Sequence, residues 1–145
     1  MPISNIFPMR YKEFEHTADI GVEIYGKTLE ELFKNAGYAF FDIIADITTI
    51  RSKVTRSVNV TGSDVETLLM NWLRELLYLF SVYQEVYGEF AIQTLQPGFL
   101  ESRVKGELLD PQKHDFHTEI KAITYHQFTV VNESGTWKAR VIFDV

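Results

Sequence analysis

The stretch EHTADIG (15–21) contains residue types that take part in catalysis and ligand binding, because His16, Thr17 and Asp19 lie close together in it. Asp19 would share a sheet face with Gly21, which has no side chain and leaves room beside a carboxylate. Thr17 and Asp19 are also typical of a turn between two strands, where they would only cap the main chain. Spacing alone favours this second interpretation.

A second polar stretch, DPQKHDFH (110–117), contains His114, Asp115 and His117. Two imidazoles and a carboxylate can bind zinc. However, the spacing matches no helical or finger zinc motif, and loops of this composition are usually solvated. We therefore expect a polar loop here rather than a metal site.

Lys121 is a third candidate, within the expected strand EIKAITYH (119–126), on the face shared with Ile123 and Tyr125. A lysine in the middle of a strand is usually exposed or at a sheet edge. If Lys121 were drawn toward carboxylates, it would instead be a functional cation. The spacing by itself favours the exposed role.

Two long amphipathic stretches predict the helices, at residues 29–46 and 64–83. Each begins with a capping-box pattern, in which two side chains close free main-chain N–H groups: Thr28 with Glu31, and Ser63 with Glu66. Their broad apolar faces must pack on a sheet. The apolar face of the first helix is expected to contain Leu29, Leu32, Phe33, Ala36, Phe40 and Ile43.

The rest of the chain alternates as β-strands do. Strands are expected at residues 11–16, 19–25, 53–62, 89–96, 99–108, 118–126, 128–132 and 137–145, with Leu100, Val104 and Leu108 on one face. In the last of them, Val141 and Phe143 would point one way and Asp144 the other. The prediction is an α+β fold in which two helices pack on a mostly antiparallel β-sheet, in a single domain of residues 1–145.

Composition limits the possible functions. Hydrophobic residues make up 46% of the chain, and the formal charge of -6 argues against a surface that binds nucleic-acid phosphates. The absence of cysteine excludes disulfides, thiolate-zinc sites and cysteine nucleophiles. The most apolar stretch (68–80) contains Arg74 and Glu75 and so predicts no membrane span, and residues 1–10 lack the apolar core of a signal peptide. We therefore expect a cytoplasmic protein.

Six stretches, in the same order along the chain, resemble the archease family. The most specific combination is HTADIG with FDV at the end of the sequence. Lys113 departs from the family pattern, because many relatives have arginine in a DPxRH stretch. The six stretches are HTADIG (16–21), TLEELF (28–33), LLMNWLRELLYLF (68–80), DPQKH (110–114), EIKAITYH (119–126) and ARVIFDV (139–145).

The resemblance implies an activator of the RtcB-type RNA-splicing ligase that is not itself an enzyme. That ligase rejoins tRNA halves after taking a guanylyl group from GTP onto its own histidine. The activator would promote this guanylylation, allow multiple turnover and broaden nucleotide use. Its partner would be the ligase protein, with no strong direct binding of nucleic acid. The implied fold is built on a strand-helix-strand-strand (SHS2-like) module.

The resemblance also implies the site residues. The metal ligands would be Asp19, Asp144 and the α-carboxylate of Val145, with Lys121 and His16 as further functional residues. Such hard oxygen donors suit Ca²⁺, which we favour, as well as Mg²⁺ and Mn²⁺. On this interpretation the last strand ends on Asp144 and Val145 because the Asp144 side chain and the Val145 α-carboxylate both bind the metal.

Two other functions remain open. The first is a metal-dependent hydrolase or nucleotide-handling enzyme that uses Asp19, Asp144 and His16, although the sequence has no nucleophile elbow or phosphate loop. The second is a general chaperone for RNA-modifying enzymes. Activity of the isolated protein would favour the hydrolase, and stimulation of unrelated enzymes would favour the chaperone.

Overall fold

The computed structural model describes the main chain of residues 9–16 and 18–145, and the side chains of the same residues except Glu15 and His16. None of the helices in these ranges is long and apolar enough to cross a membrane. In chain order the elements are β1 (Tyr11–His16), β2 (Asp19–Gly26), α1 (Leu29–Ile44), the short 3₁₀ turn η2 (Ile47–Thr49), β3 (Val54–Thr61), α2 (Val65–Tyr83), β4 (Glu85–Gln96), β5 (Phe99–Leu108), β6 (Ala122–Glu133) and β7 (Thr136–Asp144).

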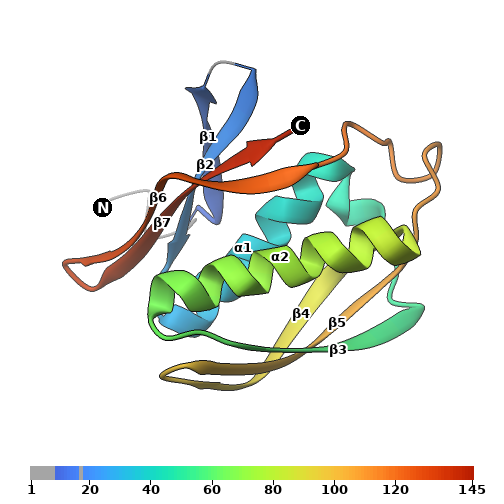
Figure 1. Ribbon diagram of the computed structural model, residues 1–145. Helices are drawn as coiled ribbons and strands as arrows, with labels where there is room; N and C mark the ends of the chain where they lie inside the picture. Colours follow the sequence, from blue (N-terminus) through green and yellow to red (C-terminus); the bar gives the residue numbers. More distant parts are fainter. Residues whose placement is uncertain (1–8, 17) are drawn as a thin grey trace, which may run out of the picture.

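The strands form two antiparallel sheets, and the two helices lie between them (Figure 1). One sheet has the order β1-β2-β7-β6 and the other the order β3-β5-β4. Helix α1 contacts β2 in the first sheet and β4 in the second, while α2 contacts β6 and β3. The predicted α+β class is confirmed, but two sheets cover the helices where we expected one.

The apolar residues of α1 explain the second sheet. Ten of its sixteen residues are buried, including Phe41 and Ile44, which were not in the predicted apolar face. A helix that is apolar on most sides must be covered on most sides. The adjacent residues Phe40 and Phe41 reach opposite sheets: the Phe40 ring lies 5.8 Å from that of Phe143 in β7, and the Phe41 ring 5.3 Å from that of Tyr87 in β4.

The two helix starts differ in how well the sequence predicted them. Thr28 Oγ1 accepts a hydrogen bond from the N–H of Glu31 at 3.1 Å, so the first predicted cap is confirmed. In α2 the cap is Asp64, whose side chain accepts from the N–H of Thr67 at 2.7 Å. The prediction that Ser63 caps α2 is therefore wrong, since an aspartate one residue later satisfies the same free donors.

The prediction for β6 and for the end of β5 also needs correction. The two strands expected around β6 are one strand, interrupted by an irregularity in pairing between Thr124 and Thr129. Lys121 lies one residue before this strand rather than in its middle. Leu108, which we expected on one face with Leu100 and Val104, is 64% exposed, whereas those two are buried. The alternation of buried and exposed side chains ends at Leu108, because this residue is the last of β5 and the chain then leaves the sheet.

A first prediction concerns Gly106 of β5, where an added Cβ would overlap the carbonyl oxygen of Val86 in β4. We expect Gly106→Ala to force the strands apart and to lower the free energy of unfolding by about 3 kcal/mol. The control is Gly135→Ala, where nothing lies within 4 Å of the added Cβ and the positive φ of 86° is the only obstacle. That control should lose about 1–2 kcal/mol. Chemical denaturation measures both, and equal losses would contradict the steric argument.

Candidate functional site

Asp19 and Asp144 lie beside each other at one end of the first sheet. Asp19 begins β2 and Asp144 ends β7, and the two antiparallel strands pair with Ile20 opposite Phe143. One further step along this register places Asp19 next to Asp144. The pairing therefore brings together two carboxylates that are far apart in the sequence.

Lys121 reaches the same end of the sheet from a third segment. Strand β6 lies on the other side of β7, with Ala122 opposite Asp144. The main-chain N–H of Lys121 donates to the carbonyl oxygen of Asp144 at 2.7 Å. The main chain at Asp19, Asp144 and Lys121 thus occupies neighbouring positions on three adjacent segments.

The two aspartates are on the outward face of the sheet. Val22, Val141 and Phe143 face the helices and have no exposed surface. Because side chains alternate along a strand, Asp19 and Asp144 point the other way. Asp144 is exposed and Asp19 is half-buried.

The side chain of Lys121 is on the helix side instead. It lines a pocket of about 390 Å³ together with Val145, with Phe80 of α2 and with Gln84, which directly follows α2. The lysine and the aspartates are therefore neighbours in the main chain, but their side chains are on opposite sides of the sheet.

Gly21 makes room for an aromatic ring rather than for a carboxylate. A Cβ at Gly21 would overlap the ring of Phe14, its partner across β1 and β2. The guanidinium of Arg140 lies 3.8 Å from the centre of that ring, and its Nη1 donates to Glu23 at 3.3 Å. Our expectation of free space beside Asp19 is therefore wrong, because a cation–π stack fills this part of the outward face.

The remaining residues of EHTADIG add little to the description. His16 pairs with Asp19 in main-chain register. Its side chain, and all of Thr17, lie outside the described residues.

The oxygen donors at the strand end suit a hard cation. Among the described side chains, no group of three or more His, Cys, Asp and Glu residues is placed to hold a metal. Asp19 and Asp144 supply two carboxylates, and the third expected donor, on Val145, belongs to the main chain. Calcium takes six to eight oxygen ligands and accepts water among them. The hydroxyl of Thr124, two residues from Ala122, is buried without a hydrogen-bond partner in the described structure and has bonding capacity to spare.

His114, a candidate zinc ligand, belongs to a buried cluster instead. Its Nδ1 accepts from the N–H of Asp110 at 2.9 Å, so the proton is on Nε2, which donates to Glu107 at 2.9 Å. Both ring nitrogens are therefore occupied. Separately, His117 Nε2 lies 3.5 Å from Asp115 Oδ2, and both side chains are exposed. The stretch 110–117 does not form the zinc site that its residue types allowed.

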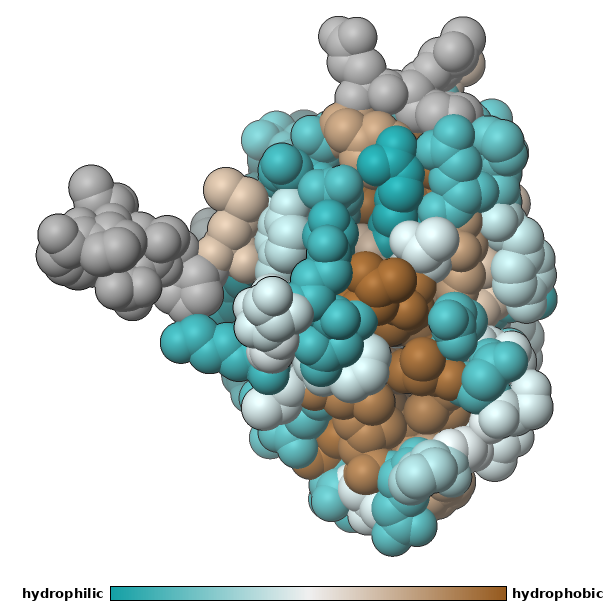
Figure 2. All heavy atoms as spheres, turned by 90° about the vertical axis from the view of Figure 1, so that its left-hand side faces the viewer, coloured by the Kyte–Doolittle hydropathy of each residue, from teal (hydrophilic) through white to brown (hydrophobic). Residues whose placement is uncertain are grey.

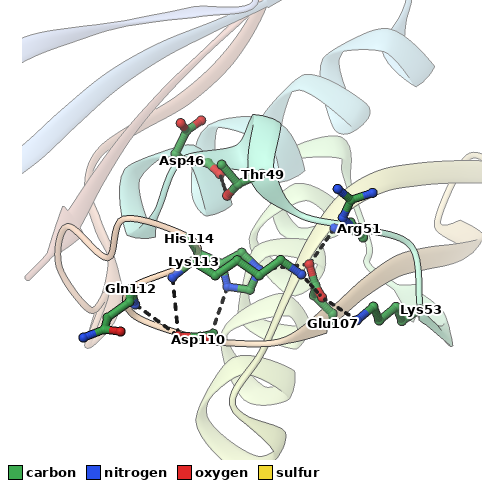
Figure 3. Close-up of polar contacts among 9 residues, drawn as sticks. All are labelled: Asp46, Thr49, Arg51, Lys53, Glu107, Asp110, Gln112, Lys113 and His114. Carbon is green, nitrogen blue, oxygen red and sulfur yellow. Dashed lines mark hydrogen bonds and ion pairs between the residues drawn. The ribbon is translucent and has the colours of Figure 1, made fainter.

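Glu107, at the centre of this cluster, is a residue that the sequence analysis missed (Figure 3). Its Oε1 accepts from Lys113 Nζ at 2.8 Å, and its Oε2 accepts from the main-chain N–H of Arg51 at 2.7 Å. Lys53 Nζ lies 3.7 Å away. The available signal in the sequence was the basic run RSKVTR (51–56), because Lys53 of this run lies near Glu107.

These contacts keep Glu107 ionised. Burial alone would raise the pKa of its carboxyl group, but hydrogen bonds from Lys113, from the main chain of Arg51 and from His114 outweigh burial and lower the pKa to about 2. The bond from Lys113 is charge-assisted and is therefore among the stronger of these contacts.

The Glu107 cluster fastens the connection between β5 and β6. The carbonyl oxygen of His114 accepts from the N–H of Asp46 at 2.8 Å, and the N–H of His117 donates to the carbonyl oxygen of Ile44 at 2.8 Å. The connection is thereby tied to the end of α1 as well as to β5. Because it leads directly to Lys121, these bonds help to set the position of that lysine.

A larger apolar pocket of about 590 Å³ lies away from the strand end. It is formed by the starts of both helices and the β4–β5 turn, with Leu29, Val65 and Leu95 among its walls. These elements are at the left of Figure 1, and Figure 2 shows apolar side chains gathered in the middle of that face with polar ones around them. The pocket contains none of the predicted site residues, so it is not part of the candidate site.

A comparison with known protein families finds one family that matches most of the chain. The model of the Archease protein family (MTH1598/TM1083) matches residues 11–145. The chain belongs to the archease family. The protein archease of Methanosarcina mazei is 41% identical over 140 residues, which cover 94% of this chain and 96% of that protein. The protein archease of Pyrococcus furiosus is 39% identical over 140 residues, which cover 94% of this chain and 99% of that protein.

Two solved archease structures have the same fold. The solution structure of protein 1598 of Methanobacterium thermoautotrophicum has a TM-score of 0.78 and 33% identity, covering 94% of this chain and 99% of that one. The crystal structure of a Thermotoga maritima archease, described as a possible chaperone, has a TM-score of 0.66 and 23% identity, covering 92% and 96%. The second likeness concerns the fold alone.

A second prediction concerns the pH dependence of stability through Glu107. Its pKa is about 2 in the folded protein against 4.5 for a free glutamate. Below pH 4.5 the unfolded chain therefore takes up a proton that the folded protein does not. The stabilisation is complete above about pH 4.5, is lost as the pH falls toward 2, and amounts to about 3 kcal/mol.

Glu107→Gln should remove this stabilisation at pH 7 and flatten the dependence of the unfolding free energy between pH 4.5 and 2. Chemical denaturation at several pH values measures both effects. The control Glu30→Gln changes an exposed carboxylate of α1 and should alter the free energy by no more than about 0.5 kcal/mol. Wild-type stability in the Glu107 variant would show that the cluster contributes nothing net.

Proposed function

We propose that this protein activates an RtcB-type RNA-splicing ligase, by promoting guanylylation of the ligase histidine, and performs no ligation itself. The observation that carries the proposal is the convergence of Asp19, Asp144 and Lys121 at one end of the first sheet. Membership of the archease family supports the choice of this ligase as the partner. In this proposal the protein also allows the ligase to turn over many times and to use a broader range of nucleotides. It would act beside the ligase in the cytoplasm during tRNA splicing.

The residues of this chain would act mainly by presenting charge. The carboxylates of Asp19 and Asp144, with the α-carboxylate of Val145, would hold a divalent cation, most suitably Ca²⁺ and otherwise Mg²⁺ or Mn²⁺. When bound, the cation would supply a compact positive charge that attracts phosphate oxygens. Lys121 would supply a second cation from the helix side of the sheet, and His16 would support the acidic group.

Single-turnover guanylylation tests this function. A purified RtcB-type ligase is incubated with labelled GTP and divalent metal, with and without this protein. Faster labelling of the ligase, with no label on this chain, is the expected result. Label transferred to this chain at rates compatible with turnover would favour a nucleotide-handling enzyme. The Thermotoga maritima relative is described as a possible chaperone; equal stimulation of unrelated RNA enzymes would favour that function instead.

A third prediction concerns the acidic group. Asp19→Asn and Asp144→Asn each remove one charged donor, and even changes outside the ligand shell commonly lower metal affinity by about tenfold or more. Both variants, and the wild-type protein extended by Gly-Ser after Val145, should bind Ca²⁺ at least about tenfold more weakly and stimulate the ligase poorly. The extension replaces the α-carboxylate by a neutral amide while leaving Phe143 to anchor the strand.

Calorimetric titration with Ca²⁺ measures the affinity, and thermal unfolding reports whether the variants are folded. The control Glu66→Gln removes one charge from the first turn of α2. It should leave both metal affinity and stimulation unchanged. Normal metal affinity and stimulation in the extended protein would show that Val145 is not a ligand. The same result in both Asp19→Asn and Asp144→Asn would refute the metal site.

A fourth prediction separates Lys121 from ordinary surface lysines. Lys121→Met keeps most of the apolar stem and removes the charge from an exposed side chain, so stability should change by less than about 0.5 kcal/mol. A charge-assisted contact is worth about 1.5–3 kcal/mol, so stimulation should fall by roughly tenfold or more. The control is Lys27→Met, at an exposed position before α1. Full stimulation by folded Lys121→Met would make Lys121 a solvated cation.

A further inference from the structure

Exposed apolar side chains gather on the side of the molecule formed by α2 and β6. Tyr78 and Val82 of α2 are 53% and 52% exposed, and Tyr125 of β6 is 55% exposed. Leu108, the last residue of β5, and Phe116, within the β5–β6 connection, are 64% and 40% exposed. These are five of the eight most exposed large apolar side chains that the structure describes. Single exposed apolar residues need no explanation, whereas a cluster of them marks an interaction site.

The members of the cluster are linked by direct contacts and by helix geometry. Arg74, Tyr78 and Val82 follow one another at intervals of four residues and so form a ridge along α2. The guanidinium of Arg74 lies 5.0 Å from the centre of the Tyr125 ring, which packs edge-on against Phe128. Helix α2 and strand β6 lie side by side (Figure 1). The ridge and the strand therefore form one continuous area.

This area extends to the candidate site. The pocket of about 390 Å³ at the end of α2 is lined by Gln84, Phe116, Lys121 and Val145. Gln84 follows the ridge residue Val82 by two positions. We call the whole area, defined by Arg74, Tyr78, Val82, Tyr125, Phe116 and Lys121, the α2–β6 surface.

The charges of the α2–β6 surface indicate the chemistry of its partner. Neither Arg74 nor Lys121 forms an ion pair with any described residue, although the chain has a net charge of -6. Two cations that have no carboxylate partner among the described residues, beside exposed tyrosines and a valine, fit a partner that offers apolar side chains and carboxylates. Tyrosine and arginine are also the residue types that most often dominate binding energy in protein interfaces.

The usual size of a stable interface indicates that one partner would cover both the candidate site and the exposed tyrosines. A standard interface buries about 800 Å² on each partner, the area of a disc with a radius of about 16 Å. That is roughly a tenth of the 7778 Å² surface of this protein. Tyr125 is four residues along the chain from Lys121, which corresponds to about 13 Å in a strand. A partner centred on Lys121 would therefore also reach Tyr125.

We infer that the α2–β6 surface is the face by which this protein docks on the ligase. The inference rests on the proposed function. It adds where the ligase binds and which residues provide affinity rather than activation. Tyr78, Val82 and Tyr125 supply affinity, while Lys121 and the aspartates at the strand end act on the docked ligase. The complementary face of the ligase offers apolar side chains to the ridge and carboxylates to Arg74 and Lys121.

The fifth prediction tests this surface with Tyr78→Glu and Val82→Glu, two exposed positions where a charge should not disturb folding. Each variant should bind a purified RtcB-type ligase about thirtyfold more weakly, the effect of losing an interface residue worth about 2 kcal/mol. Biolayer interferometry measures the affinity, and the control Val131→Glu places the same charge on a 41% exposed valine near the β6–β7 turn. High concentrations of the two docking variants should restore full guanylylation, whereas Asp144→Asn should still stimulate the ligase poorly when its own concentration is raised.

The possible results separate the two proposals. A wild-type protein that neither binds nor stimulates the ligase overturns the proposed function, and the docking surface with it. A wild-type protein that stimulates, with docking variants that bind normally, overturns the docking surface alone. Analytical ultracentrifugation covers the remaining case. A wild-type dimer that the variants dissociate, without loss of ligase affinity, would assign the α2–β6 surface to a second copy of the chain.

Discussion

The pairing of β2 with β7 is the constraint on which the candidate site depends, because it joins an early segment of the chain to its last strand. Seven residue pairs, from Ile20–Phe143 to Gly26–Trp137, hold the two strands in register. A slip of one residue would turn Phe143 outward and Asp144 toward the helices. Phe143 is fully buried and packs against Phe40 of α1, so such a slip would expose a large aromatic side chain. The hydrophobic face behind the sheet thus sets where the carboxylates lie.

The position of Lys121 depends on polar bonds instead. The connection from β5 to β6 is long for a segment without regular structure, and such connections are usually functional or disordered. This connection is held through Glu107 of β5. The carboxylate of Glu107 accepts hydrogen bonds from Lys113 and His114 of the connection and from the main-chain N–H of Arg51. A buried carboxylate stabilises a fold only when its lost hydration is replaced by several good hydrogen bonds, and Glu107 has them. Local opening at this cluster would displace Lys121 while the two sheets remain folded.

The sequence predicted the features that depend on local patterns. Helical periodicity, strand alternation and the cap at Thr28 are properties of neighbouring residues, and the structure bears them out. The second sheet, the burial of Glu107 and the filling of Gly21 by Phe14 depend on segments that are distant in the chain. Alternation along one strand tells which residues share a face, but not what covers that face. The surplus of apolar residues in α1 was a signal of the second sheet, but the prediction did not use it.

The placement of charge on both sides of one sheet end restricts the shape of a partner. Asp19 and Asp144 point outward, while Lys121 points toward α2. A flat surface can contact one side of a sheet, so it could not engage the carboxylates and the lysine together. A ligase that uses both must receive the strand end in a cleft, with one wall against the outward face and the other against α2. Clefts of this kind are where enzymes commonly place their reactive groups. The α2–β6 surface would then contact one wall of the ligase cleft, and the end of β7 would insert into the cleft.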